Sequence, residues 1–311
     1  MTRAYDAVAV VVTWNRKQLL LGALAALAEQ DPAPKAVVVV DNASTDGTAA
    51  AVLERFDTVD LVVSDTNTGG AGGFATSVAR ALAEHDPDVL WLMDDDTVPR
   101  PGALAELLRA YGSHRGDPEG RRPALVASRV VWTDGRAHPM NTPRAKPGAR
   151  RPERRNAAAI GCVPIRSASF VSVLCDAAAV RERGLPVADY FLWNDDFEFT
   201  ARLLRGRTGL LCPSSLVEHR TATFGSTDAD PGERFYYEVR NKTWVFTRSS
   251  GLSPAEKALY AGATLARWAR TFRVSSDRST LWRGLRRGLV AGVRSGPRPN
   301  SEVLSAEVLG G

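Results

Sequence analysis

The chain has 311 residues, of which 44% are hydrophobic and 24% charged, and its formal net charge is +5. This composition is ordinary for a folded protein and excludes a disordered or fibrous chain. The sequence has no run of about 18 apolar residues, so no transmembrane helix is expected. Because residues 1–6 also lack an apolar signal segment, the sequence predicts a cytoplasmic protein.

Cysteine spacing and charge distribution narrow the class further. The three cysteines are isolated, which argues against a zinc site or a disulfide framework. Basic residues concentrate in two segments, Arg144–Arg155 and Arg267–Arg298. Excess positive charge of this kind suits phosphate-bearing substrates, anionic lipid or nucleic acid.

The first hundred residues alternate apolar β-branched runs with segments of helical spacing. Strands are expected at Ala7–Thr13, Ala36–Val40, Leu61–Ser64 and Val89–Met93, and helices at Arg16–Glu29, Thr48–Phe56 and Phe74–Glu84. Such alternation predicts an α/β fold with a mostly parallel central sheet flanked by helices. Ligands in such sheets bind beyond the carboxyl ends of the strands, where polar clusters stand in this chain.

The second half has a less regular pattern. The expected elements are strands at Ala124–Trp132 and Val163–Leu174, a mobile Pro/Arg-rich loop over residues 139–156, a helix at Ala177–Arg183 capped by Asp176, a helix from Trp193 through Arg205, a short strand from Gly209 toward His219, and Arg-rich helices from residue 251. We therefore expect a catalytic domain at residues 1–250 and a basic helical extension at residues 251–311.

Asp94-Asp95-Asp96 directly follow an apolar strand. Three adjacent carboxylates at such a place favour a cationic partner, and a divalent metal carrying a diphosphate would balance them. The alternative is a polar loop with a helix cap before Pro99. His219 is a candidate further ligand, because a carboxylate–imidazole set suits Mn²⁺ or a similar ion, although a lone histidine is often structural.

Two loops near the other strand ends are candidate nucleotide contacts. Asp41 begins a segment of Asn, Ser, Thr and Gly, and its carboxylate can accept hydrogen bonds from a base or ribose; ordinary turn chemistry is the alternative. The loop Asn67–Phe74 holds four glycines before a helix, which lets the backbone approach an anion. It lacks the lysine of a P-loop.

Asp195-Asp196 form a second acid cluster. One of two crowded carboxylates holds its proton more tightly, which is useful in a general base. The alternative is a pair of acids favoured by a helix N-terminus.

These motifs, in this order, resemble those of family 2 glycosyltransferases with a GT-A fold. The resemblance covers roughly residues 7–245 and is strongest with actinobacterial galactofuranosyltransferases, because of the loop Asn67–Phe74 and the Asp triplet. Tyr236–Asn241 also resembles a tail motif of these groups. Related rhamnosyltransferases have a less glycine-rich loop.

The resemblance implies roles for particular residues. Asp196, six residues before Arg202, is the implied base, and an extra residue at Asn194 leaves Asp195 as the alternative. The implied metal ligands are Asp94, Asp96 and His219. The implied substrate-binding residues are Thr13, Asn15, Arg16, Asp41, Asn67, Gly69, Gly70, Gly72, Gly73, Asp94, Asp95, Trp193 and Glu198.

The sequence thus predicts an inverting glycosyltransferase that uses Mn²⁺ or Mg²⁺ and a nucleotide-sugar donor. UDP-galactofuranose is the first expectation and dTDP-rhamnose the alternative, with a hydroxyl of a glycan or polyprenyl-linked molecule as acceptor. A sugar-nucleotide nucleotidyltransferase would need a glycine-rich loop where Thr13–Arg16 stands, and an inactive nucleotide-binding module would not need the acid set. Nucleic-acid binding is disfavoured, because the arginines lack interleaved aromatics.

The C-terminal arginines accompany an apolar stripe. Trp282, Leu285, Leu289 and Val293 recur at spacings of three and four and are flanked by arginines. A basic amphipathic helix of this kind predicts peripheral binding to an anionic membrane, here the inner face of the cell membrane. The alternative is that the stripe packs on the catalytic domain or on a second subunit of a homo-oligomer.

Overall fold

The computed structural model describes residues 4–222, 224 and 230–304. Its centre is one ten-stranded sheet with the order β3-β2-β1-β4-β9-β6-β10-β8-β7, and β5 (Thr97–Pro99) pairs with β10. The first four strands are parallel, as predicted; they are β1 (Ala7–Thr13), β2 (Ala36–Asp41), β3 (Asp60–Val63) and β4 (Val89–Asp94). The whole sheet is mixed, because β9 (Val173–Asp176) lies antiparallel between β4 and β6 (Leu125–Val131).

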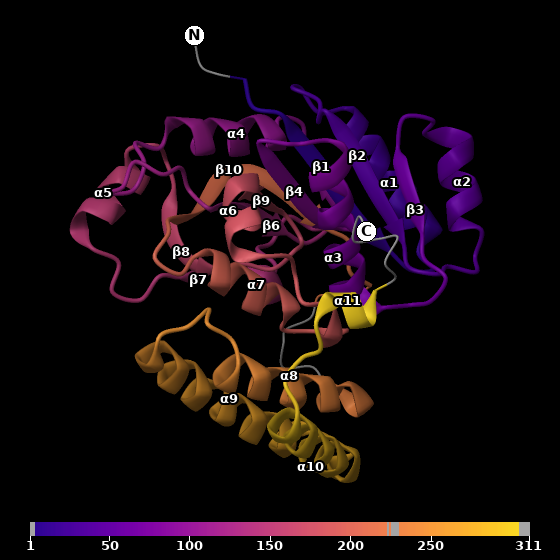
Figure 1. Cartoon of the computed structure of the whole chain (residues 1–311), viewed down its shortest axis with the longest axis vertical. Helices are drawn as coiled ribbons and strands as arrows, with labels where there is room; N and C mark the ends of the chain where they lie inside the picture. The colour runs from indigo at the N-terminus through magenta and orange to yellow at the C-terminus, as the bar shows by residue number, and fades with distance from the viewer. Residues whose placement is uncertain (1–3, 223, 225–229, 305–311) are drawn as a thin grey trace.

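Helices cover both faces of this sheet (Figure 1). One face packs on α1 (Lys17–Ala28), α2 (Thr48–Arg55) and α4 (Ala103–Ser113). The other face packs on α3 (Gly69–Glu84), α6 (Ala177–Arg183) and α7 (Asp195–Leu203). Successive residues of a strand point to opposite faces, so Val11 joins the first core and Val10 the second. This double cover explains why the central strands are continuous apolar runs.

The structure corrects three expectations for the middle of the chain. The single strand expected at residues 163–174 is two strands, β8 (Val163–Ser167) and β9, which pair with different partners. The expected loop at residues 139–156 contains a 3-10 turn (η1, Pro139–Asn141), the short strand β7 (Arg144–Ala145) and the helix α5 (Arg151–Ala158). Backbone pairing of β7 with β8 gives this segment an ordered path that its irregular side-chain pattern did not reveal.

The third correction concerns the glycine-rich segment. The expected loop ends at Gly69, where α3 begins, so most of its glycines lie in the first turn of a helix. Gly69 has φ +74°, and a Cβ on Gly73 would lie 2.3 Å from Cγ1 of Val12. These glycines therefore let α3 start at a left-handed residue and approach β1 closely.

Among the described residues after the long strand β10 (Gly209–His219), the chain forms the α-helices α8 (Phe235–Thr247), α9 (Pro254–Val274), α10 (Arg278–Arg294) and α11 (Asn300–Val303). The first three form a layer beneath the sheet domain, while α11 returns to α3 (Figure 1). α10 meets α8 through Gly284, Gly288 and Gly292, and a Cβ at Gly288 would lie 2.8 Å from the carbonyl oxygen of Tyr236. The expected boundary at residue 250 falls between α8 and α9, two helices of this layer. In the described parts of the chain, no helix is both long and apolar enough to cross a membrane.

Candidate active site

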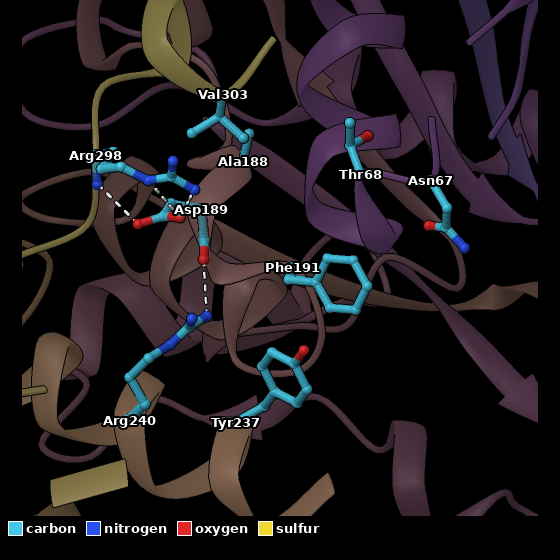
Figure 2. A pocket seen from close by; sticks show the side chains of 9 residues that line it. All are labelled: Asn67, Thr68, Ala188, Asp189, Phe191, Tyr237, Arg240, Arg298 and Val303. Carbon is cyan, nitrogen blue, oxygen red and sulfur yellow. Dashed lines mark hydrogen bonds and ion pairs between the residues drawn. The ribbon is translucent and has the colours of Figure 1, made fainter. Parts of the chain in front are cut away.

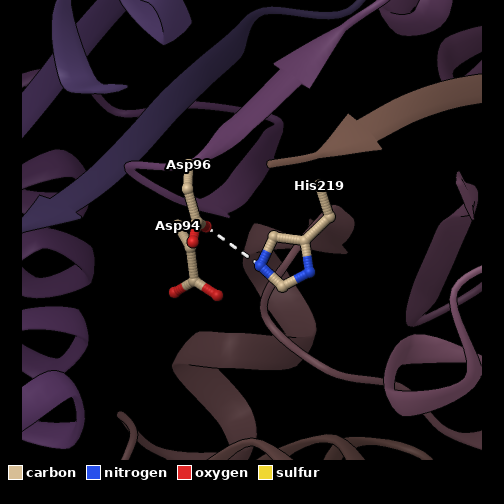
Figure 3. A group of neighbouring side chains, drawn as sticks. All are labelled: Asp94, Asp96 and His219. Atoms are coloured by element: carbon tan, nitrogen blue, oxygen red, sulfur yellow. Dashed lines mark ion pairs between the residues drawn. The ribbon is translucent and has the colours of Figure 1, made fainter. Parts of the chain in front are cut away.

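A carboxylate–histidine group lies where β4 and β10 end, and Figure 3 shows its three side chains turned toward one another. Asp94, Asp96 and His219 each offer one ligand atom, and these atoms all lie within 4.8 Å of one another. Oδ1 of Asp96 is buried and accepts no hydrogen bond from the described residues, yet it lies 2.9 Å from Nε2 of His219. Two such atoms aimed at a common point fit a divalent cation with mixed oxygen and nitrogen ligands.

His219 is oriented from its far side. Its Nδ1 lies 2.9 Å from Oδ1 of Asn141, an amide oxygen that only accepts, so Nδ1 carries the proton and donates it. In the neutral ring this leaves Nε2 free to ligate a metal. Burial disfavours the imidazolium, but the contact with Asp96 and the charges of Asp96 and Asp94 outweigh it and raise the pKa of His219.

The three aspartates of the triplet do different things. Burial and the charge of Asp96 raise the pKa of Asp94 to about 7. Burial also opposes ionisation of Asp96, but His219 and Arg16 outweigh it and hold the pKa of Asp96 below its usual value. Asp95 has its pKa raised to about 6, mainly by burial and against the charge of Arg16. Asp94 and Asp96 thus interact with the charge of His219, whereas Asp95 interacts chiefly with Arg16.

Asp95 fixes the end of β1. Its Oδ2 accepts a hydrogen bond from the Thr13 hydroxyl at 2.8 Å, and its Oδ1 accepts one from Nη1 of Arg16 at 3.2 Å. The same Arg16 nitrogen donates to Oδ2 of Asp96 at 2.9 Å. About half of the Arg16 side chain stays exposed beside the candidate metal-binding group, which leaves guanidinium N–H donors open to a ligand. Thr13 thus has a partner within the protein, and the nucleoside contact that the resemblance implies for it stays a prediction.

The loops after β1 and β2 are tied together around Asp41. The Asn15 backbone N–H donates to the Ser44 hydroxyl at 2.8 Å, and Asn15 Oδ1 accepts from the Thr45 N–H at 2.7 Å. Oδ1 of Asp41 accepts from the Ser44 N–H, while its Oδ2 is buried and finds no hydrogen bond among the described residues. An unsatisfied buried oxygen costs free energy, so this atom is poised to accept from a ligand.

Asn42 connects this loop to the glycine-rich segment. Its Nδ2 donates to Oδ1 of Asn67 at 3.0 Å and to the Gly69 carbonyl at 2.9 Å, and its Oδ1 accepts from the Thr68 N–H at 2.9 Å. Oδ1 of Asn67 also accepts from the Gly69 N–H. Asn67 therefore shapes the start of α3. Of the glycines, Gly72 is packed against Thr68, while Gly70 has open space where a Cβ would stand, which leaves room for a ligand.

The loop before the acid pair has a strained backbone. Phe191, Trp193 and Asn194 have φ of 61°, 64° and 67°, a region that non-glycine residues rarely occupy. Such conformations cost about 1–3 kcal/mol each and persist only where surrounding contacts hold them. Because Asn194 directly precedes α7 in this conformation, the loop sets the direction of both carboxylates that follow.

Helix α8 holds this loop. Nδ2 of the fully buried Asn241 donates to the carbonyls of Tyr190, Leu192 and Trp193 at 2.8–2.9 Å. Nδ2 of Asn194 donates to Oε2 of Glu238 at 2.8 Å. The motif Tyr236–Asn241 thus serves to clamp the loop that precedes the acid pair.

Asp195 and Asp196 occupy the first turn of α7, close enough to the triplet for their charges to interact with Asp94. Burial and the charge of Asp196 raise the pKa of Asp195 well above its usual value. Burial also raises the pKa of Asp196, against the Phe197 N–H and the charges of Lys242 and Arg144. Of the two, Asp196 keeps more of its surface open and has the cations beside it.

Glu198 has partners within the protein. Both of its oxygens accept from Nε of Arg202, at 2.9 and 3.2 Å, and Oε1 also accepts from the Ser249 hydroxyl. Arg202 in turn donates to the carbonyls of Gly184 and Leu185. This pair anchors α7 to the segment that follows α6, and the substrate contact expected of Glu198 stays a prediction.

A pocket lies beside this site, between the start of α3, the loop at residues 188–191, α8 and the C-terminal segment (Figure 2). Phe191 stacks on Tyr237 with ring centroids 5.2 Å apart, and Arg298 pairs with Asp189 at 2.8 Å. None of the triplet or pair carboxylates lines it.

A sheet domain that gathers nucleotide-type loops, a candidate metal group and an acid pair at one rim has the architecture of a GT-A glycosyltransferase. Residues 8–143 match the model of "Glycosyl transferase family 2", so this part of the chain is a glycosyltransferase domain of that family. It is similar to galactofuranosyltransferase GlfT1 of Mycolicibacterium smegmatis, with 39% identity over 115 residues, 37% of this chain and 38% of that protein.

Two further relatives cover more of the chain. Galactofuranosyltransferase GlfT1 of Mycobacterium tuberculosis is 29% identical over 77% of this chain and 82% of its own length. The N-acetylglucosaminyl-diphospho-decaprenol L-rhamnosyltransferase of the same species is 28% identical over 76% of this chain and 82% of its own length.

Solved structures share the fold. Staphylococcus aureus TarS in complex with UDP-GlcNAc superposes with a TM-score of 0.61 and 17% identity, covering 92% of this chain and 81% of that one. The Pyrobaculum calidifontis mannosyltransferase PcManGT, in complex with GDP-Man and Mn²⁺, superposes with a TM-score of 0.57 and 18% identity, covering 98% of this chain and 80% of that one. The predicted family and fold class are therefore confirmed.

Sequence reasoning missed two residues that shape the site and undervalued a third. Asn141 and Asn42 bond to expected site residues but were not assigned roles. A single asparagine in a loop carries no pattern that would mark it. Asn241 stood within the quoted tail motif, which was the available signal.

Proposed function

We propose that this chain is an inverting, metal-dependent glycosyltransferase that uses a nucleotide-sugar donor. The observation that carries the proposal is the convergence of Asp94, Asp96 and His219 to within 4.8 Å, beside the acid pair of α7. A bound Mn²⁺ or Mg²⁺ would supply positive charge to the leaving diphosphate. The donor set fits such an ion, and the PcManGT complex, of the same fold, contains Mn²⁺.

Residues of the protein bind the donor and accept the proton of the acceptor hydroxyl. Arg16 reaches the rim from the end of β1, with donors facing the place of the diphosphate. The unsatisfied Oδ2 of Asp41 accepts from the nucleoside, and Gly70 leaves space at the start of α3. Asp196 accepts the proton of the acceptor hydroxyl as that oxygen attacks the anomeric carbon from the face opposite the diphosphate. One base and no covalent intermediate are needed, so the configuration inverts.

Asp196 is the better base of the pair. Two adjacent buried carboxylates share one proton, and the carboxylate with cations nearby keeps the negative charge. Lys242 and Arg144 act on Asp196, whereas the side-chain charges that act most strongly on Asp195 are the like charges of Asp196 and Asp94.

For the donor we propose UDP-galactofuranose, with dTDP-rhamnose as the second candidate. Relatives named as transferases of each sugar match more than three quarters of the chain at nearly equal identity. The glycine-rich Asn67–Phe74 segment favours the first. The test is a donor screen with UDP-galactofuranose, UDP-galactose and dTDP-rhamnose, scored by product mass and UDP or dTDP release, with and without chelator. Full turnover in excess chelator would refute metal dependence.

We further propose that the layer of α9 and α10 binds an anionic membrane, so that the site reaches a lipid-linked acceptor. α10 packs on α8 through its glycine face, and of its apolar stripe Leu285 packs against the cluster around Phe235 while the Trp282 ring contacts Phe272 of α9. The rest of the stripe faces away from these contacts. Trp282 is 57% and Val293 64% exposed, and Arg283, Arg286 and Arg287 beside them are exposed as well. Exposed aromatic and aliphatic residues flanked by arginines suit an anionic headgroup region.

A further inference from the structure

The ring of Phe197, which directly follows the proposed base, carries two cations. Nζ of Lys242 lies 4.1 Å from the ring centroid, and the guanidinium carbon of Arg144 lies 5.3 Å from it. The Phe197 N–H donates to Oδ1 of Asp196 at 2.6 Å. Lys242 comes from α8 and Arg144 from β7, so segments far apart in the sequence place positive charge near Asp196.

Lys242 is buried without a carboxylate partner. Only 4% of the residue is exposed, and within the described residues its ammonium makes neither a hydrogen bond nor an ion pair. Burial lowers the pKa of Lys242 to about 8. An ammonium held this way by a ring face loses much of its hydration, which a ring replaces only in part. A negatively charged group of a ligand would compensate the ammonium for this lost hydration.

The acids near Lys242 are already engaged. Glu238 accepts from Asn194, from Nη2 of Arg267 and from the Trp268 indole, so its charge is shared among those donors. Asp196 is needed as the base. Arg144 lies over Phe197 and over Tyr260, 5.6 Å from the Tyr260 centroid, and its guanidinium makes no hydrogen bond to any residue in the described ranges. Two cations therefore remain available at this place.

We propose that Lys242 and Arg144 form an anion subsite that binds a phosphate group of the acceptor. A phosphate has several charged oxygens, so it can accept hydrogen bonds from an ammonium and from a guanidinium at the same time. Asp94, Asp96, His219 and Arg16 are the groups that face the donor diphosphate, so the second anion belongs to the other substrate. This inference rests on the proposed role of Asp196, and it gives the ordered segment at residues 139–158 a function.

The test measures phosphate binding directly. Inorganic pyrophosphate and geranyl diphosphate are titrated calorimetrically into the full chain, in chelator and with excess UDP to fill the nucleotide site. The wild type should bind both. Lys242→Met and Arg144→Gln should each weaken binding about tenfold, about 1.4 kcal/mol. Arg144→Lys should retain most of the affinity. Lys146→Met is the matched control and should change nothing, because that ammonium already pairs with Glu153 at 2.6 Å.

The outcomes separate cleanly. Tighter binding of geranyl diphosphate assigns the phosphate to a lipid-linked acceptor, and equal binding assigns it to a soluble phosphorylated glycan; both support the subsite. Equal affinity of the wild type, Lys242→Met and Arg144→Gln overturns it. If Lys242→Met unfolds, the titrations of Arg144→Gln and Arg144→Lys decide whether the subsite exists, because Arg144 is exposed and its substitution leaves the core intact. If Asp196→Asn remains active while the pyrophosphate result holds, the base assignment fails and the subsite stands.

Discussion

Nδ1 of His219 donates to Oδ1 of Asn141 across 2.9 Å, although 78 residues separate the two in the sequence. This bond presents Nε2 of His219 toward Asp96. Groups that orient a ligating histidine in this way typically contribute tenfold to hundredfold to metal affinity.

We therefore predict that Asn141→Ala weakens Mn²⁺ binding about tenfold to a hundredfold with the fold intact. Asn141→Asp should keep the affinity, because a carboxylate accepts the same bond from Nδ1. Calorimetric titration with Mn²⁺ checks both variants. An unchanged affinity in Asn141→Ala would mean that the histidine needs no orienting partner or is not a ligand.

Metal binding should weaken as the pH falls below about 7. The pKa of Asp94 is raised to about 7 and that of His219 is raised above its usual value, so protons occupy both groups at lower pH. A metal ion must displace those protons, and the apparent affinity should fall by up to about tenfold per pH unit for each proton. Mn²⁺ titrations between pH 5.5 and 8.5 measure this slope, and a flat profile would contradict the ligand set.

The acid pair should respond asymmetrically to substitution. Asp196→Asn keeps the shape but cannot accept a proton, so transfer should fall by about a hundredfold or more while UDP binding is retained. Asp195→Asn should lower turnover less, because its carboxyl already holds the shared proton. Product formation and UDP affinity are measured for both. A dead Asp195→Asn beside an active Asp196→Asn would move the base by one residue.

The residues at the carboxyl ends of the central strands could be predicted from the sequence, because each strand end is marked by a local pattern. Thr13, Asp41 and Asp94 each end a continuous apolar strand, so the parallel sheet brings them to one edge by topology alone. The expectation of one strand at residues 163–174 was wrong for the same reason. A run of apolar residues does not show where the chain turns, and in the structure β8 and β9 pair with different strands.

The contacts that orient the site could not be predicted in this way. Asn141 and Asn241 act on segments 78 and about 50 residues away, across pairings that exist only after folding. Nothing in the sequence showed that the side chains of Thr13 and Glu198 bond to Asp95 and Arg202. The substrate contacts expected of these two residues stay predictions.

The clamp by Asn241 should affect turnover more than donor binding. Asn241→Asp places a carboxylate against three carbonyl oxygens, so the loop at residues 190–194 should shift and misplace the acid pair. We expect kcat to fall at least about tenfold with UDP affinity unchanged, since even small misplacements of reacting groups are costly. The acid limb of the pH–rate profile should move as well. Asn156→Asp, the same exchange on α5, is the control and should leave kcat and the profile unchanged.

The apolar stripe of α10 should carry membrane binding. Because α8 packs on α10, removing the C-terminal helices would expose α8, so point variants of the full chain are the better probes. Arg286→Gln with Arg287→Gln should weaken binding to anionic vesicles by about 2 kcal/mol, roughly thirtyfold, at about 1 kcal/mol for each arginine. Trp282→Ser should weaken it further, while Leu53→Ser, an equally apolar and 64% exposed position on α2, should not. Vesicle co-sedimentation at low and high salt measures this. If all variants bind alike and sedimentation velocity instead shows a dimer that Trp282→Ser dissociates, the stripe is a contact between subunits.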